Sequence, residues 1–243
     1  AKAEQSPRER RRLPRRTIAA AVLILLLVPL TLLMGVVWLD SRRYYLVSVL
    51  ILLETMLPFF LVFEGRKPRA RELVVIAVLC AIGVAGRAVF FMLPQFKPVM
   101  AIAIVAGVAF GGETGFLVGA MTMLTSNVLY GQGPWTPWQM FAMGIVGFLA
   151  GVLFKRGLLR RSCASLCAFG ALTAVVVYGG IVNLGSALIG SPVMSADILL
   201  TYYVTGLPMD CVHAAATWIF LWFGALPMLE KFDRIKVKYG LVE

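Results

Sequence analysis

Charged side chains are scarce in this sequence. Only 14% of its 243 residues are charged, whereas 60% are hydrophobic and the mean hydropathy is +0.87. Soluble domains carry about a quarter charged residues, so this chain has too little polar surface for a water-soluble fold. The composition excludes a soluble enzyme, a nucleic-acid-binding domain and a disordered chain. A polytopic helical membrane protein remains, because the apolar runs are continuous and do not alternate as β-barrel strands do.

The signatures of common catalytic centres are also missing. The sequence has no Walker motif, no HExxH and no Gly-x-Ser-x-Gly, and one histidine cannot form a His-rich metal centre. The four cysteines form no CxxC pair, which favours small apolar residues over a disulfide or a metal site; they are Cys80, Cys163, Cys167 and Cys211. We therefore expect no catalytic residue, no metal and no permanently bound cofactor.

The apolar runs are long enough to cross a membrane. A spanning helix needs about 20 apolar residues. The runs are 17–39, 44–63, 73–93, 98–130, 138–154, 163–189 and 208–229. The fourth run suits either one long helix or two spans that turn within 111–115.

The distribution of positive charge decides between these alternatives. With two spans the chain has eight, and the segments on the N-terminal side hold 7, 4, 0, 4 and 4 Lys or Arg residues against 3 in the opposite loops. With one helix, the basic cluster within 155–161 falls on the other side. Cytoplasmic loops carry the excess of Lys and Arg. The sequence therefore predicts eight spans, with both termini in the cytoplasm and the chain in the plasma membrane of a prokaryote.

The basic loop at 66–71 marks the main boundary. Residues 1–16 form a basic cytoplasmic tail, 17–70 a two-helix membrane appendage, and 71–243 a six-helix bundle rich in Gly and Ala. The first apolar run has 23 residues, so we interpret it as a retained anchor and not a cleaved signal peptide. Glu54 lies in the middle of the second run, with no partner that the sequence identifies.

Polar side chains inside the bundle predict a binding site. Ionisable groups are costly in a membrane and mark functional positions by default. The predicted topology places five such residues in the outer half of the bundle: Arg87, Asn127, Asn183, Asp210 and His213. The loops on that side add Gln95, Phe96, Lys97, Gln132, Trp135, Trp138 and Gln139. Convergent polar and aromatic groups are typical of a small-molecule pocket.

Several of these residues have ordinary structural alternatives. Trp135 and Trp138 also suit an interfacial aromatic belt. Asp210 follows Pro208, so Pro208 can begin a helix whose N-terminus Asp210 stabilises. Arg87 can snorkel to the surface or pair with a carboxylate of the bundle. His213 lies one turn after Asp210, which suits an orienting pair or the acid–base pair of an intramembrane enzyme.

Small residues recur at helical spacing. Ala77, Ala81 and Ala85 form a stripe on one face of the third span, where another helix can approach closely. The partner is either another protein or a neighbouring helix of the same bundle. Two Gly-x-x-x-Gly pairs, at 115/119 and 147/151, have the same two interpretations.

Four segments resemble the substrate-binding S components of energy-coupling factor (ECF) transporters. They are 77–87, 95–98, 206–214 and the unusual run Gly-Gln-Gly-Pro-Trp-Thr-Pro-Trp-Gln-Met at 131–140. The resemblance extends over roughly 71–229. It implies a bundle that binds a vitamin or cofactor precursor on its outer face and docks through the stripe of Ala77, Ala81 and Ala85. The implied partners are a transmembrane coupling protein (T component) and two separate ATPases, and the subunit then topples to release its ligand inside.

The resemblance also suggests the ligand and its site. It assigns the pocket to the loop 95–97 and to Asn127, Trp135, Trp138, Gln139, Asn183, Asp210 and His213. The run at 131–140 is most similar to members associated with cobalamin, some of them labelled queuosine-precursor transporters. We therefore rank a corrinoid first and a queuosine precursor second, although flat aromatics and amides suit either.

Two other functions remain open at this stage. The pair Asp210 and His213 suits an intramembrane enzyme that acts on a lipid or isoprenoid substrate. The two additional N-terminal helices depart from the six-helix family unit and suit a structural membrane anchor.

Overall fold

The computed structural model describes residues 70–191 and 195–239, with isolated positions between 22 and 54. The predicted basic tail and most of the two-helix appendage lie outside the described residues. The described bundle is all-α and contains no strand. Its helices are α3 (Ala70–Val89), α4 (Val99–Phe110), α5 (Gly112–Tyr130), α6 (Thr136–Lys155), α7 (Cys163–Thr173), η2 (Ala174–Gly179), α8 (Gly180–Gly190) and α9 (Ala196–Tyr239).

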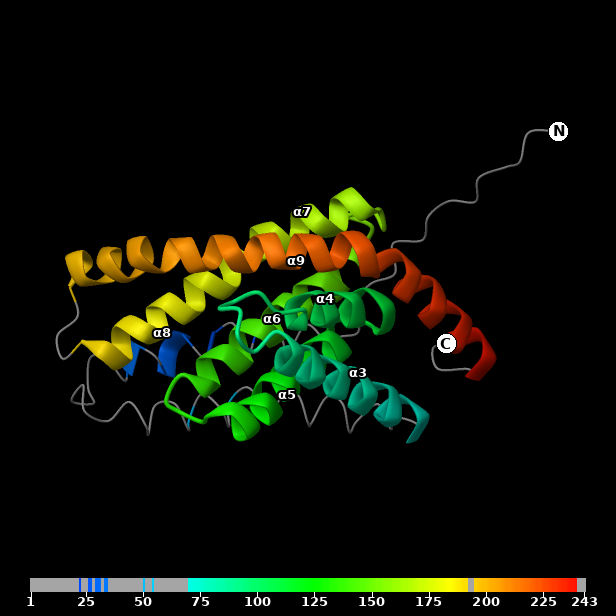
Figure 1. The fold of residues 1–243 in the computed structure, drawn as a ribbon, viewed down its shortest axis with the longest axis horizontal. Coiled ribbons are helices and arrows are strands. Elements are labelled where there is room, and N and C mark those ends of the chain that lie inside the picture. Colours follow the sequence, from blue (N-terminus) through cyan, green and yellow to red (C-terminus); the bar gives the residue numbers. More distant parts are fainter. Residues whose placement is uncertain are drawn as a thin grey trace.

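These elements make six helical passes, because α7, η2 and α8 run on as one helix (Figure 1). Four passes are long and apolar enough to cross a membrane: α3, α6, the continuous helix Cys163–Gly190, and α9. The shorter α4 is buried at ten of its twelve residues. At about 18 Å it is shorter than a bilayer core, and its neighbours shelter it. The prediction of an all-α, polytopic membrane protein is confirmed.

A glycine turn separates α4 from α5. Gly111 has φ +106°, a backbone conformation that residues with a Cβ rarely adopt, so the first helix ends there. The two helices then fold back on each other, since a Cβ at Gly115 would meet the Cα of Gly107 at 2.7 Å. The charge distribution favoured two helices over a single long one, and the structure has two.

Glycines hold α4, α5 and α6 in backbone contact. A Cβ at Gly107 or Gly115 would collide with the carbonyl oxygen of Gly147, and a Cβ at Gly151 would collide with the backbone of Gly112. Small residues permit such close helix approach in membranes. The two Gly-x-x-x-Gly pairs therefore serve packing inside the bundle.

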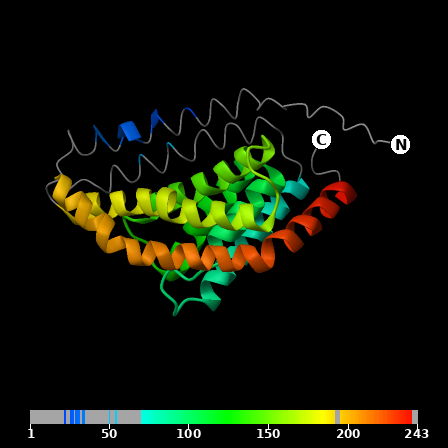
Figure 2. The ribbon, with the colours of Figure 1, turned by 90° about the horizontal axis from the view of Figure 1, so that it is seen from above.

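The last helix differs from its prediction. The sequence placed its start at Pro208, but α9 runs from Ala196 to Tyr239 with Pro208 inside it. The apolar residues before the proline continue the helix upstream, and the Ser195 hydroxyl caps its beginning by accepting from the Ile198 N–H at 3.3 Å. Figures 1 and 2 show α9 along the length of the bundle, with its final part bent, as expected after Pro227.

The pass from 163 to 190 contains a π-helical segment at Ala174–Gly179. Ser162 caps its first turn by accepting from the Ser165 N–H at 3.4 Å. A π-helical turn inserts an extra residue into the helix and often lies at a functional site. It shifts the side chains after it around the helix relative to those before it.

One contact involves the isolated N-terminal positions. The Thr31 hydroxyl donates to Glu54 Oε1 at 2.5 Å, so Glu54 has a partner that the sequence did not identify. Its second oxygen, Oε2, is buried without a hydrogen bond.

The close contact between Gly147 and Gly115 predicts that a larger residue at position 147 destabilises the bundle. We expect Gly147→Ala to lower the free energy of unfolding by about 1–3 kcal/mol, because its Cβ meets the backbone of Gly115, which has no side chain that can move aside. Thermal unfolding of the detergent-purified chain measures this. Gly180→Ala is the matched control, because a Cβ there has open space. Equal stability of the two variants would contradict the assigned packing.

Candidate functional site

A buried polar network joins α3, α5 and α6. Arg87 Nη1 donates to Ser126 Oγ at 2.5 Å and to Asn127 Oδ1 at 2.6 Å. Asn127 Nδ2 in turn donates to Thr136 Oγ1 at 3.0 Å and to Gln139 Oε1 at 2.9 Å. Ser126, Asn127 and Thr136 are buried. Both N–H groups of the Asn127 amide are thus bonded. The network brings three predicted site residues together: Arg87, Asn127 and Gln139.

The partners of Arg87 test whether it pairs with a carboxylate of the bundle, one of the two structural alternatives given above. Its hydrogen bonds go to neutral oxygens, and no described carboxylate forms an ion pair with it. A cation held by neutral acceptors keeps its full positive charge.

A second cluster joins the π-helical segment and α8 to α9. Asn183 Nδ2 donates to Asp210 Oδ2 at 2.8 Å. The Asp210 carboxylate lies directly against Gly179, where a Cβ would be 2.5 Å from Oδ2, and the Tyr203 hydroxyl donates to the Gly180 carbonyl at 2.6 Å. Asp210 is therefore in the middle of α9, not at its N-terminus, and Asn183 is what stabilises its carboxylate.

His213 does not form the expected pair with Asp210. It is buried, and its ring packs edge-on against Tyr178 with centroids 4.7 Å apart. Its Nδ1 atom has no hydrogen-bond partner among the described residues. The Asp210 carboxylate accepts a hydrogen bond from Asn183 instead. Asp210 and His213 therefore lack the geometry of an acid–base pair.

The two clusters lie within electrostatic range of each other. Tyr178 lies close enough to Arg87 and Asp210 to interact with both, and Lys97 interacts with Arg87 and His213. Lys97 lies in the loop between α3 and α4 and donates to the Leu93 carbonyl at 3.0 Å. Partial burial lowers its pKa, and the nearby positive charge of Arg87 lowers that pKa further.

Aromatic rings surround this region. Phe96 packs against Phe90 and Phe220 with centroids 5.8 and 5.4 Å apart, which ties the loop before α4 to α9. Trp138 is 4% exposed and its ring lies against Gly185, so it is a packed residue and not part of an interfacial belt. Trp135 is 45% exposed, as a belt residue would be, and its ring covers Gly133.

Within the described chain, two predicted residues make no hydrogen bond or ring contact in these clusters. Gln132 is exposed in the loop between α5 and α6. Gln95 is half-buried and has φ +55°, an uncommon conformation for a residue other than glycine.

Sequence reasoning missed four residues that the structure places here: Ser126, Thr136, Tyr178 and Phe220. Ser126 and Thr136 are common in spans and carried no signal of their own. Tyr178 precedes two glycines in an otherwise apolar helix, which was a usable signal for a polar contact.

Comparisons with known proteins identify the family of this chain as substrate-binding S components of ECF importers. The family described as "ECF-type riboflavin transporter, S component" matches residues 67–224, more than half of the chain. The chain belongs to this family. Such a subunit is a multi-pass plasma-membrane protein that binds a substrate and is not a catalyst, so the alternative of an intramembrane enzyme is not supported. A coupling protein and ATPases are its general partners.

Several curated proteins are also similar. A UPF0397 protein of Vibrio atlanticus (strain LGP32) is 28% identical over 135 residues, which are 53% of this chain and 74% of the relative. A UPF0397 protein of Aliivibrio salmonicida (strain LFI1238) is 35% identical over 95 residues, 36% of this chain and 51% of the relative. The chain therefore spans about half the length of that second relative. No solved structure matches the chain.

The comparisons support the S-component assignment but not its ligand type. Neither cobalamin nor a queuosine precursor is confirmed, and the description of the matched family names riboflavin. The run at 131–140 was therefore a good signal for the broad class and an insufficient one for the substrate.

The polar network predicts a loss of stability on truncation. We expect Asn127→Ala to lower the free energy of unfolding by about 1–2 kcal/mol, because it removes three hydrogen bonds that each contribute roughly 0.6 kcal/mol in a membrane protein. Thermal unfolding in detergent measures this. Thr125→Ala changes the exposed neighbouring residue and serves as the control. A loss no larger than that of the control would show that the network does not hold α3, α5 and α6 together.

Proposed function

We propose that this chain is the substrate-binding subunit through which an ECF importer takes up a planar heteroaromatic vitamin, with riboflavin ranked first. One observation carries the proposal: two polar clusters and an aromatic cluster converge at one end of a bundle that belongs to a riboflavin-type family. A corrinoid and a queuosine precursor rank below riboflavin.

The chemistry of the site suits a flavin. An isoalloxazine ring is flat and has an edge of alternating carbonyl and imide groups. Arg87 and Lys97 donate hydrogen bonds, whereas the amides of Gln139 and Asn183 can donate and accept. Aromatic side chains such as Phe96, Tyr178 and Phe220 provide flat surfaces for the ring. The unpartnered Nδ1 of His213 offers one further polar contact.

The face of α3 supports docking onto a coupling protein. Ala77, Ala81 and Ala85 are all exposed, so the described bundle does not use this stripe for its own packing. The buried residues of α3 are Ile76, Leu79 and Gly83, on the other side of the helix. Exposed apolar residues flank the stripe: Val74, Val78 and Ile82. An apolar face with a central strip of small residues suits close contact with another membrane helix.

The first test identifies the ligand. We expect the full chain, purified from riboflavin-containing medium, to retain a flavin that mass spectrometry and its yellow absorption band reveal. The physical reason is the convergence of hydrogen-bonding and aromatic groups at one site. A corrinoid or deazapurine in its place would correct the ligand and leave the transport role intact. Absence of any ligand, together with no binding of added riboflavin, would contradict the proposal.

The second test concerns docking. We expect Ala81→Leu to lower both co-purification of the coupling protein and vitamin uptake at least tenfold, because the added side chain separates two closely packed helices. Ligand binding by the isolated subunit should stay unchanged. Ala168→Leu makes the same change at an exposed position of α7 and is the matched control. Normal assembly and uptake with Ala81→Leu would show that α3 does not dock.

A further inference from the structure

A small cavity lies at the end of α6 opposite the polar network. Its volume is about 220 Å³. Thr136 and Gln139, which belong to the network, are in the first turn of α6, whereas Lys155 is in its last turn. The helix is therefore about 30 Å long between the two sites. The cavity and the proposed vitamin site therefore lie at opposite ends of α6.

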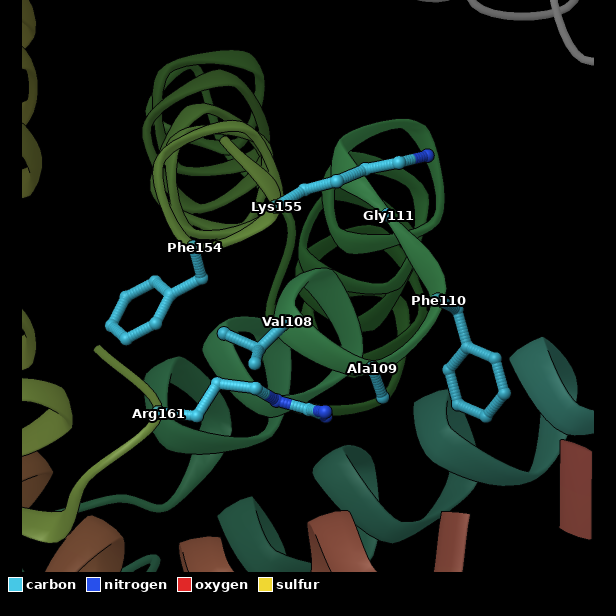
Figure 3. A pocket seen from close by; sticks show the side chains of 7 residues that line it. All are labelled: Val108, Ala109, Phe110, Gly111, Phe154, Lys155 and Arg161. Carbon is cyan, nitrogen blue, oxygen red and sulfur yellow. The ribbon is translucent and has the colours of Figure 1, made fainter. Parts of the chain in front are cut away.

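The walls of the cavity combine apolar and cationic groups (Figure 3). Val108, Ala109 and Phe110 come from the last turn of α4, and Phe154 comes from α6. Two cations line the cavity as well: Lys155 at the end of α6 and Arg161 in the loop before α7. A ligand that fills this space therefore meets hydrocarbon on one side and positive charge on another.

The end of α9 closes around the same place. Phe232 packs on Phe110 with ring centroids 5.2 Å apart, and Lys236 Nζ lies 5.5 Å from the centroid of the Phe110 ring. Asp233 pairs with Arg161 at 3.3 Å and with Lys236 at 2.9 Å. This carboxylate is the main acidic competitor for the cations of the cavity.

Basic residues nevertheless outnumber acidic residues at the end of the bundle that holds the cavity. The basic residues of α6, of the loop before α7 and of the end of α9 are Lys155, Arg156, Arg160, Arg161, Lys231, Arg234, Lys236 and Lys238. The acidic residues on the same segments and at the start of α5 are Glu113, Glu230 and Asp233. The charge distribution of the sequence predicts that this end faces the cytoplasm, where membranes present anionic lipids.

We propose that this cavity binds the headgroup of an anionic phospholipid. The phosphate pairs with the Arg161 guanidinium, Lys155 adds positive charge on another side of the cavity, and the beginning of an acyl chain covers the apolar wall of Val108, Ala109 and Phe154. A soluble phosphate uses only the cations and leaves that wall uncovered. The cavity also lies where apolar helices end in a basic residue, which is the level of lipid headgroups. A lipid there ties α4 and α6 to the loop before α7.

The test is lipid retention by the full chain. Native mass spectrometry compares bound phosphatidylglycerol with phosphatidylcholine of the same acyl chains, added at equal concentration to the detergent-purified protein. We expect preferential retention of phosphatidylglycerol. Lys155→Gln and Arg161→Gln should each weaken it roughly tenfold, because each removes a cation that lines the cavity and can bond to the phosphate directly. Asp233→Asn should strengthen it, because Arg161 then loses its competing carboxylate.

Arg160→Gln is the matched control. It removes one positive charge from the same loop at an exposed residue that does not line the cavity, so retention should fall less than twofold. Equal losses in all three variants would overturn the proposal in favour of a diffuse basic surface. Equal retention of the two lipids, or complete displacement by excess inorganic phosphate, would overturn it too. If Lys155→Gln does not fold, Arg161→Gln and Asp233→Asn still give opposite expected results.

Discussion

A cation that lies inside a membrane protein must be surrounded by hydrogen-bond acceptors, and Arg87 is where this constraint acts here. Its guanidinium draws Ser126 and Asn127 of α5 towards α3, and Asn127 then holds Thr136 and Gln139 at the start of α6. Three helices are thereby registered at one end by polar contacts. Because the acceptors are neutral, the positive charge stays available to a ligand. The requirement that stabilises this end of the bundle is thus also what makes it suitable for binding.

The opposite end is held by close packing. Glycines of α4, α5 and α6 allow backbone contact, so the short α4 stays buried although it cannot cross a bilayer alone.

The π-helical segment before α8 gives the second polar cluster its shape, because Gly179 leaves room for the Asp210 carboxylate. The bundle therefore separates a packed end, with the cavity at its rim, from a polar end where we propose that substrate binds. Between them, α3 keeps an exposed apolar face with Ala77, Ala81 and Ala85.

Long apolar runs and the placement of positive charge were enough to predict six helices and the turn near Gly111. They also led to Arg87, Asn127 and Gln139, because polar residues in spans are conspicuous. The predicted start of α9 was wrong. Pro208 was taken as its first helical residue, although apolar residues continue before it. Tyr178 and the π-helical segment were missed, because an apolar run does not reveal which residue faces a neighbour. The ligand type could not be predicted from 131–140, because amides and aromatics recognise several flat molecules.

Riboflavin titration of the purified full chain, followed by flavin fluorescence, tests the central claim most directly. The claim is that the ligand binds at the end of the bundle organised by Arg87. Arg87→Gln should weaken riboflavin binding at least tenfold, whereas Lys155→Gln, at the far end of α6, should leave it within twofold of the unsubstituted chain. Equal affinities for both variants and the unsubstituted protein would show that the ligand binds elsewhere and would contradict the account.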